Sequence, residues 1–155
     1  MKSTNSRHKT MNWKLIIKRI LFYLLSFTWG IITSFAGLVM ITICALKGSV
    51  HTFHGRLYGT IGKSWGGLEL GCFFICGEND QSEHLCKHEC GHGIQNIIFG
   101  PFFLLIIGIP SAIRYWYRRL KYERHGLTPP TAYDDAWFEG LATHWGDKYI
   151  LTDRI

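Results

Sequence analysis

The chain has 155 residues, a formal net charge of +6 and only 18% charged residues, while 47% of its residues are hydrophobic. This length supports one domain with a short appendage, and the apolar content exceeds what an ordinary soluble domain needs. Nine Lys and Arg residues but no Asp or Glu precede Glu69, and no basic groove with interleaved aromatics accompanies them. The basic half therefore favours a lipid bilayer as partner and argues against nucleic acid.

The N-terminal third predicts a membrane anchor. Residues 1–19 are polar and basic, as is typical of a cytosolic tail beside a membrane. Residues 20–46 carry no charge, and as a helix they would extend about 40 Å, more than the roughly 30 Å hydrocarbon core. This run is too long for the core of a signal peptide. We therefore expect a transmembrane helix, with a buried helix of a soluble protein as the alternative.

Gly and aromatic residues dominate residues 47–77 and favour strands over a helix. Residues 56–61 and 68–75 are predicted to form two strands of a hairpin, joined through residues 62–64.

Two helices are predicted after this hairpin, and an apolar segment lies between them. Ser82 or Asp80 could cap a helix over residues 83–99, which Gly100 and Pro101 would end. Residues 102–113 are apolar but too short to span a bilayer cleanly, and a basic, aromatic stretch follows them. Residues 102–121 are therefore expected to form an interfacial or re-entrant helix.

The segment at 83–99 contains a complete H-E-x-x-H pattern. In a helix, His88 and His92 lie one turn apart on the same face and can bind one metal ion. Glu89 lies beside them, where a carboxylate can take a proton from a metal-bound water. This combination points to a catalytic zinc site.

A catalytic zinc ion keeps three protein ligands and one open position, so a third ligand is required. Glu139 is the best candidate because it begins a helix, predicted over residues 136–145, whose small residues Gly140 and Ala142 permit close packing. If the segment at 102–113 crossed the membrane, Glu139 would emerge on the opposite side from His88. The shared metal therefore requires that this segment does not cross.

These residues resemble the gluzincin zinc metallopeptidases, whose third ligand is a glutamate on a later helix. Over about residues 56–147 the chain also resembles a family of small bacterial membrane proteins with a zincin-type motif, carried by His88–Asn96, Gly100–Pro101, Ile109–Arg118 and Trp137–Ala142. The resemblance implies zinc ligands at His88, His92 and Glu139, with Glu89 as the base, in a bacterial cytoplasmic membrane. One departure is Thr143, where many gluzincins have an acidic residue that orients a ligand histidine.

The cysteines support a rival hypothesis, a structural Cys/His zinc site. Cys86 and Cys90 alternate with the histidines, and Cys72 and Cys76 precede them. On a helix, however, Cys86 and Cys90 point away from the histidine face, so one metal could not use both sets. The four thiols could instead form disulfides in an oxidising compartment.

Three other residues have alternative roles. His84 could be a fourth ligand or could orient one, although a solvated side chain is expected. His144 and Tyr149 could donate to a developing oxyanion, although packing or surface positions are expected for both.

The sequence thus predicts an α+β, zincin-like minimal domain over residues 47–155, with a hairpin, an active-site helix and a glutamate helix. The expected activity is hydrolysis of peptide bonds in a peptide or protein substrate by a membrane-anchored zinc metallopeptidase. Two alternatives stay open: a catalytically silent, membrane-anchored zinc-binding interaction module, and a Cys/His structural zinc protein.

Overall fold

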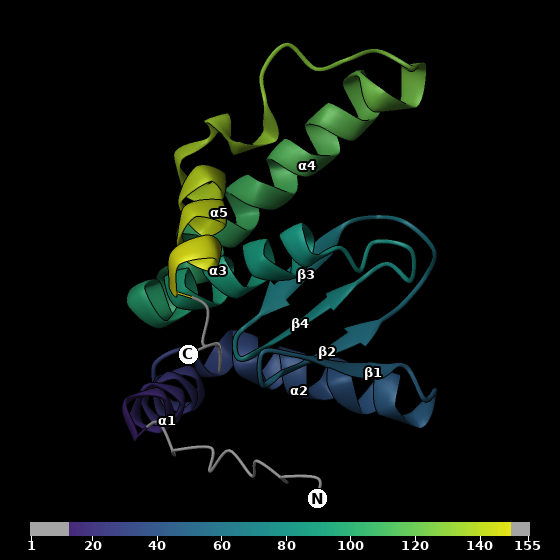
Figure 1. The fold of residues 1–155 in the computed structure, drawn as a ribbon. Coiled ribbons are helices and arrows are strands. Elements are labelled where there is room, and N and C mark those ends of the chain that lie inside the picture. The colour runs from purple at the N-terminus through teal and green to yellow at the C-terminus, as the bar shows by residue number, and fades with distance from the viewer. Residues whose placement is uncertain (1–12, 150–155) are drawn as a thin grey trace, which may run out of the picture.

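The computed structural model describes residues 13–149, which form an α+β fold (Figure 1). The elements run in the order α1 (Trp13–Thr28), α2 (Ile31–Leu46), β1 (Val50–Phe53), β2 (Arg56–Thr60), β3 (Gly67–Leu70), β4 (Phe73–Cys76), α3 (Glu83–Phe99), α4 (Ile109–Lys121) and α5 (Trp137–Tyr149). A short 3₁₀ turn (Gly100–Phe102) and a π-helical turn (Leu104–Gly108) connect α3 to α4. Two further 3₁₀ turns (Glu123–His125 and Tyr133–Asp135) lie between α4 and α5.

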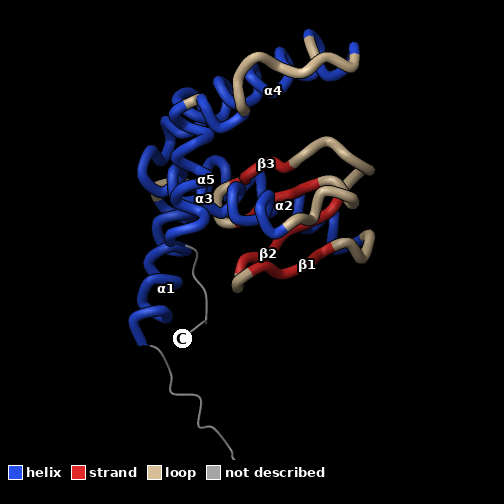
Figure 2. Tube along the Cα trace, turned by 45° about the horizontal axis from the view of Figure 1, so that its top comes forward, coloured by secondary structure: helices blue, strands red, loops and turns tan. Residues whose placement is uncertain are grey.

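The four strands form one sheet in the order β1-β2-β4-β3, with α2 on one face and α3 on the other (Figures 1 and 2). β1 and β2 form an antiparallel hairpin, as do β3 and β4, and β2 pairs with β4 in parallel. The predicted hairpin between residues 56–61 and 68–75 is therefore wrong. Gly71, at a φ of 78° that favours glycine, begins a turn that divides 68–75 into two strands.

The prediction of a single helix over residues 20–46 is likewise wrong, because two helices, α1 and α2, share this run. α1 and α2 meet at an angle of 99°, and residues 13–19 belong to α1; residues 1–12 of the predicted tail lie outside the described part of the chain. A Cβ at Gly30 would overlap the side chain of Asn96, so the bend permits close contact with α3. Within residues 13–149 no single helix is long and apolar enough to cross a bilayer. Two bent pairs, α1 with α2 and the α3 segment with the α4 segment, have the required length and apolar composition when each pair is taken together.

The predicted helix over 83–99 is confirmed by α3. The Ser82 hydroxyl accepts a hydrogen bond from the amide of Leu85 at 3.2 Å, and Gly100, at a φ of 54°, caps the other end. The chain then bends by 117° and continues into α4, which projects away from the sheet (Figure 2). α5 returns along α3, and it runs slightly further than the predicted helix over residues 136–145.

A buried arginine on β2 contacts α1, β4 and the turn between β3 and β4. Arg56 is 5% exposed, and its guanidinium donates to the carbonyl oxygens of Cys72 at 3.4 Å and Gly71 at 3.1 Å. Its central carbon lies 5.0 Å from the ring centre of Phe22 on α1 and 5.7 Å from that of Phe74 on β4. The charge is therefore held by backbone carbonyls, by aromatic faces from α1 and β4, and by the buried carboxylate of Glu69 on β3, whose Oε1 lies 3.7 Å from the guanidinium.

Candidate metal centre

Two glycines allow α3 and α5 to approach closely enough to share a site. A Cβ at Gly91 would overlap the carbonyl oxygen of Ala142, and a Cβ at Gly146 would overlap that of Lys87. Ala142 is fully buried in this contact, as its small size suggested, whereas Gly140 faces the carbonyl of Asp134 instead. Small residues thus bring the two helical backbones together at the level of the H-E-x-x-H pattern.

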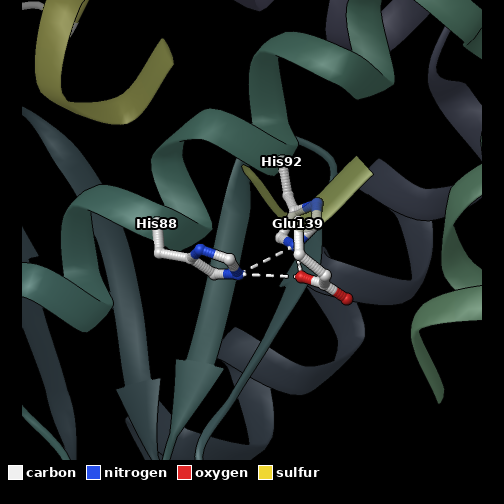
Figure 3. Close-up of side chains that lie close together, drawn as sticks. All are labelled: His88, His92 and Glu139. Carbon is white, nitrogen blue, oxygen red and sulfur yellow. Dashed lines mark hydrogen bonds and ion pairs between the residues drawn. The ribbon is translucent and has the colours of Figure 1, made fainter. Parts of the chain in front are cut away.

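The structure brings together the three predicted ligands, His88 and His92 from α3 and Glu139 from α5 (Figure 3). Oε2 of Glu139 lies 3.1 Å from Nε2 of each histidine, and the two Nε2 atoms lie 3.1 Å from each other. All three residues are buried. Tetrahedral ligands of an ion with bonds of about 2.0 Å lie roughly 3.3 Å apart, so this triangle matches one face of such a tetrahedron.

Gln95 determines which nitrogen of His92 faces the centre. Its side-chain amide donates to the carbonyl oxygen of Phe138 at 2.7 Å, so its other atom, Oε1, is the acceptor. Nδ1 of His92, 2.7 Å from Oε1, must then carry a proton. Nε2 is consequently the nitrogen available to a metal, and Gln95 is a buried residue that the sequence reasoning missed.

Thr143 performs the corresponding task for the other histidine. Its Oγ1 lies 2.8 Å from Nδ1 of His88, on the side of the ring away from Glu139. The resemblance to gluzincins predicts an acidic residue at this position. A hydroxyl instead fills the position that orients the ligand histidine.

The arrangement is suited to a cation. With Nδ1 of His92 protonated, the lone pair of its Nε2 faces the carboxylate oxygen of Glu139 at 3.1 Å, which is repulsive without a positive charge between them. The second carboxylate oxygen of Glu139, Oε1, is buried and makes no well-formed hydrogen bond among the described residues, although Ser111 and Tyr133 lie close enough to Glu139 to interact with it. A donor set of two imidazoles and one carboxylate is typical of catalytic zinc sites.

Protonation in the metal-free protein follows from the same contacts. Burial alone would lower the pKa of His92, but its contact with Glu139 outweighs this effect and raises the pKa to about 9. Burial would conversely raise the pKa of Glu139, yet the two histidines hold this pKa well below its usual range. In the absence of a metal, a proton on His92 therefore supplies the positive charge that the centre requires.

Glu89 lies outside the ligand triangle but beside it. It is 4% exposed, and burial raises its pKa above the usual value although both histidines oppose this effect. A Cβ added at Gly67 would lie 2.5 Å from Oε1 of Glu89, so strand β3 passes directly over the carboxylate. Glu89, His88 and Gly67 line one cavity of about 390 Å³. The carboxylate thus borders a space that a small substrate segment could enter.

Tyr133 is a second residue that sequence reasoning missed. It lines the same cavity, and its ring centre lies 6.2 Å from that of His88. Burial, together with the charge of Glu139, raises the pKa of Tyr133, so the phenol stays protonated at neutral pH. Arg114 holds this segment through the carbonyl oxygens of Tyr133 at 3.1 Å and Ala132 at 2.6 Å.

The remaining candidates lie away from the three ligands. His84 and His144 are exposed, as expected; His84 lines the same cavity as Glu89 but does not belong to the ligand group. Tyr149 is 50% exposed and lines a different cavity beside α1. Neither His144 nor Tyr149 is therefore placed to act at this centre.

The cysteines do not join the metal centre. All five are free and buried, and Cys76, Cys86 and Cys90 pack with Tyr58 and Phe74 in an apolar cluster between α3 and the sheet. Burial raises the pKa of Cys86 to about 12, so this thiol is a poor metal ligand at neutral pH. Among the residues described, the His88, His92 and Glu139 group is the one in which potential ligand atoms converge. The arrangement therefore gives no support to the Cys/His hypothesis.

Comparison with known proteins adds no relative. No protein-family model, no curated protein sequence and no solved structure matches this chain. The resemblance to gluzincins therefore remains a prediction that depends on the motif residues and on the spacing between them.

Proposed function

We propose that this protein is a zinc-dependent peptidase. The observation that carries the proposal is the convergence of two imidazole nitrogens and one carboxylate oxygen at 3.1 Å, beside a separate buried carboxylate that borders a cavity. A structural metal site needs no such additional carboxylate, and it usually has four protein ligands. His88, His92 and Glu139 would hold the zinc ion and leave one position open.

When bound, zinc would polarise the scissile carbonyl and increase the acidity of a water molecule in the open position. Glu89 would accept a proton from the water whose oxygen attacks the scissile carbonyl carbon, and would donate it to the amine as the C–N bond breaks, a role for which its raised pKa is suitable. Tyr133, which stays protonated, donates a hydrogen bond to the oxygen of the scissile group as negative charge develops there.

The sheet offers a way to align the substrate. β3 is an edge strand, and Gly67 brings it against Glu89. An extended peptide that pairs with the free edge of β3 would pass along the cavity that Glu89 and Tyr133 line. The proposed substrate is therefore an extended segment of a peptide or protein.

The test combines zinc content with cleavage of a library of fluorescence-quenched peptides. We expect Glu89→Gln to retain zinc and to lose about 10²-fold or more in cleavage rate, because the base is lost and the ligands remain. Glu139→Gln should lose zinc. Glu78→Gln, at an exposed glutamate in the loop before α3, is the matched control and should behave as wild type.

Three outcomes would contradict the proposal. Wild-type protein that binds no zinc would exclude the metal centre. Wild-type protein that binds zinc but cleaves no peptide would favour the silent binding module. Full cleavage by Glu89→Gln would exclude Glu89 as the base.

A further inference from the structure

The outer face of α2 carries its large apolar side chains. Six of them are between 37% and 65% exposed, namely Ile31, Ile32, Phe35, Leu38, Val39 and Ile43. The inner face, which packs on the sheet, is instead made mainly of small residues, including Ser34, Gly37 and Cys44. A helix on the surface of a water-soluble protein has the opposite arrangement, so the outer face of α2 requires an apolar partner.

α1 and the bend between α3 and α4 extend this surface. Ile20, Leu24 and Phe27 of α1 are between 42% and 60% exposed. The two bends are in contact, because a Cβ at Gly100 would overlap the ring of Trp29. Exposed apolar side chains therefore continue onto the second bend, where Phe102 is 56% and Leu105 is 65% exposed.

The position of the sheet excludes a membrane-spanning α2. Close contacts run along the helix, from Ser34 against Gly71, through Gly37 against Leu70, to Cys44 against Gly59. If α2 crossed a bilayer, the sheet and its open edge strands would enter the hydrocarbon core, where unpaired backbone groups are not tolerated. Only the outer face of α2 can therefore meet lipid.

The side of α1 opposite Ile20 and Phe27 carries positive charges that are complementary to anionic headgroups. Lys14 and Lys18 near the start of α1 and Lys148 near the end of α5 line a cavity of about 510 Å³. Its wall also contains apolar residues of α1 and α3, including Leu21 and Ile97, and no Asp or Glu from the described residues. Clustered lysines next to an apolar surface are typical of proteins that bind anionic lipid.

We propose that α1, α2 and the bend between α3 and α4 form a monotopic surface that embeds in one leaflet of an anionic lipid bilayer. The helices lie in the plane of the membrane, and their outer faces enter the acyl region. The metal centre and both ends of each bent helix pair then lie on the same side of the membrane. This proposal is independent of the peptidase proposal, since none of its residues belongs to the metal centre.

Flotation with lipid vesicles tests the surface. The full-length protein, freed of detergent, should bind vesicles of phosphatidylcholine and phosphatidylglycerol. Phe35→Glu should reduce the bound fraction about tenfold or more, because a charge replaces an embedded ring. Leu127→Glu, at a residue 57% exposed in the segment between α4 and α5, is the matched control and should bind as wild type. Circular dichroism and the melting temperature establish that each variant is folded.

The lipid dependence tests the charges. Lys14→Glu combined with Lys18→Glu should remove the preference for phosphatidylglycerol and leave the weaker binding to pure phosphatidylcholine. Unchanged flotation of a folded Phe35→Glu variant would overturn the proposal. A wild-type protein that stays out of the vesicles as a dimer would also overturn it, because a second copy would then cover the apolar surface.

Labelling in membranes tests whether the chain crosses. Since the five native thiols are buried, a single added cysteine can be labelled selectively. Lys14→Cys, Lys63→Cys and Arg124→Cys should all react with an impermeant maleimide from the same side of sealed membrane vesicles. If the Lys14→Cys and Lys63→Cys variants react from opposite sides, the α1–α2 pair crosses the bilayer and the proposal is overturned.

Discussion

Replacing Thr143 by Val tests whether a hydroxyl orients His88. Val has nearly the same shape as Thr but cannot bond to Nδ1 of His88, which lies 2.8 Å from the Thr143 oxygen. Loss of a partner that orients a metal ligand typically weakens metal binding about 10- to 100-fold, or roughly 1.4–2.7 kcal/mol. We therefore expect Thr143→Val to bind zinc about 10- to 100-fold more weakly than the wild-type protein does.

The assay is a competition for zinc between the folded protein and a chromophoric chelator. Thr143→Ser is the matched control, because it keeps the hydroxyl and should bind zinc within about threefold of wild type. The reasoning fails if Thr143→Val binds zinc as tightly as wild type. It also fails if the Ser variant loses as much affinity as the Val variant, because the methyl group would then be the important feature.

Three further predictions concern protons and close packing. Without metal the pKa of His92 is raised to about 9, so zinc binding at pH 7 should release about one proton, and zinc affinity should increase as the pH rises towards 9. Calorimetry in two buffers of different ionisation enthalpy measures the number of protons released. A value of zero would contradict the prediction. Gly91→Ala should separate α3 from α5 and so lower both the melting temperature and the zinc affinity. Gly108→Ala is the control and should change neither, because its new Cβ would lie 3.3 Å from the nearest atom, which belongs to the flexible side chain of Leu104. Gly67→Ala should retain zinc but lose cleavage, because the new Cβ would lie 2.5 Å from Oε1 of Glu89; full activity would show that β3 can move away at little cost.

The helices around the metal centre were predictable because their signals are local. Ser82 and Gly100 delimit α3 by side-chain and backbone preferences that operate within a few residues. The spacing of His88 and His92 then places both rings on one face of the helix. Glu139 required a longer inference, which depended on small residues that let two helices approach.

The sheet was less predictable because its pairing is not local. Residues 68–75 have the composition of one strand, and Gly71 alone marks the turn inside them. The parallel pairing of β2 with β4 places Tyr58 opposite Phe74, although β3 lies between the two strands in the sequence, and no local pattern specifies this pairing. The break in the uncharged run at 20–46 likewise depends on Asn96, which packs against Gly30 from a distant helix.

The groups that orient the ligands were missed for a related reason. Gln95 lies three residues after His92, a spacing that many polar helix residues share by chance. Only its second hydrogen bond, to the Phe138 carbonyl on a different segment, shows its role. Thr143 was noticed only as a departure from an acidic residue, since a sequence does not show that a hydroxyl lies 2.8 Å from a ring nitrogen.

The buried Arg56 has a practical consequence for making this protein in the laboratory. Removing apolar N-terminal helices is a common way to make a protein easier to purify. Here the cut would remove the Phe22 ring that covers the guanidinium and the Ser34 contact with Gly71, one of the residues whose carbonyl binds Arg56. A fragment that begins after α2 should therefore fail to fold, and measurements on the candidate metal centre should use the full-length chain.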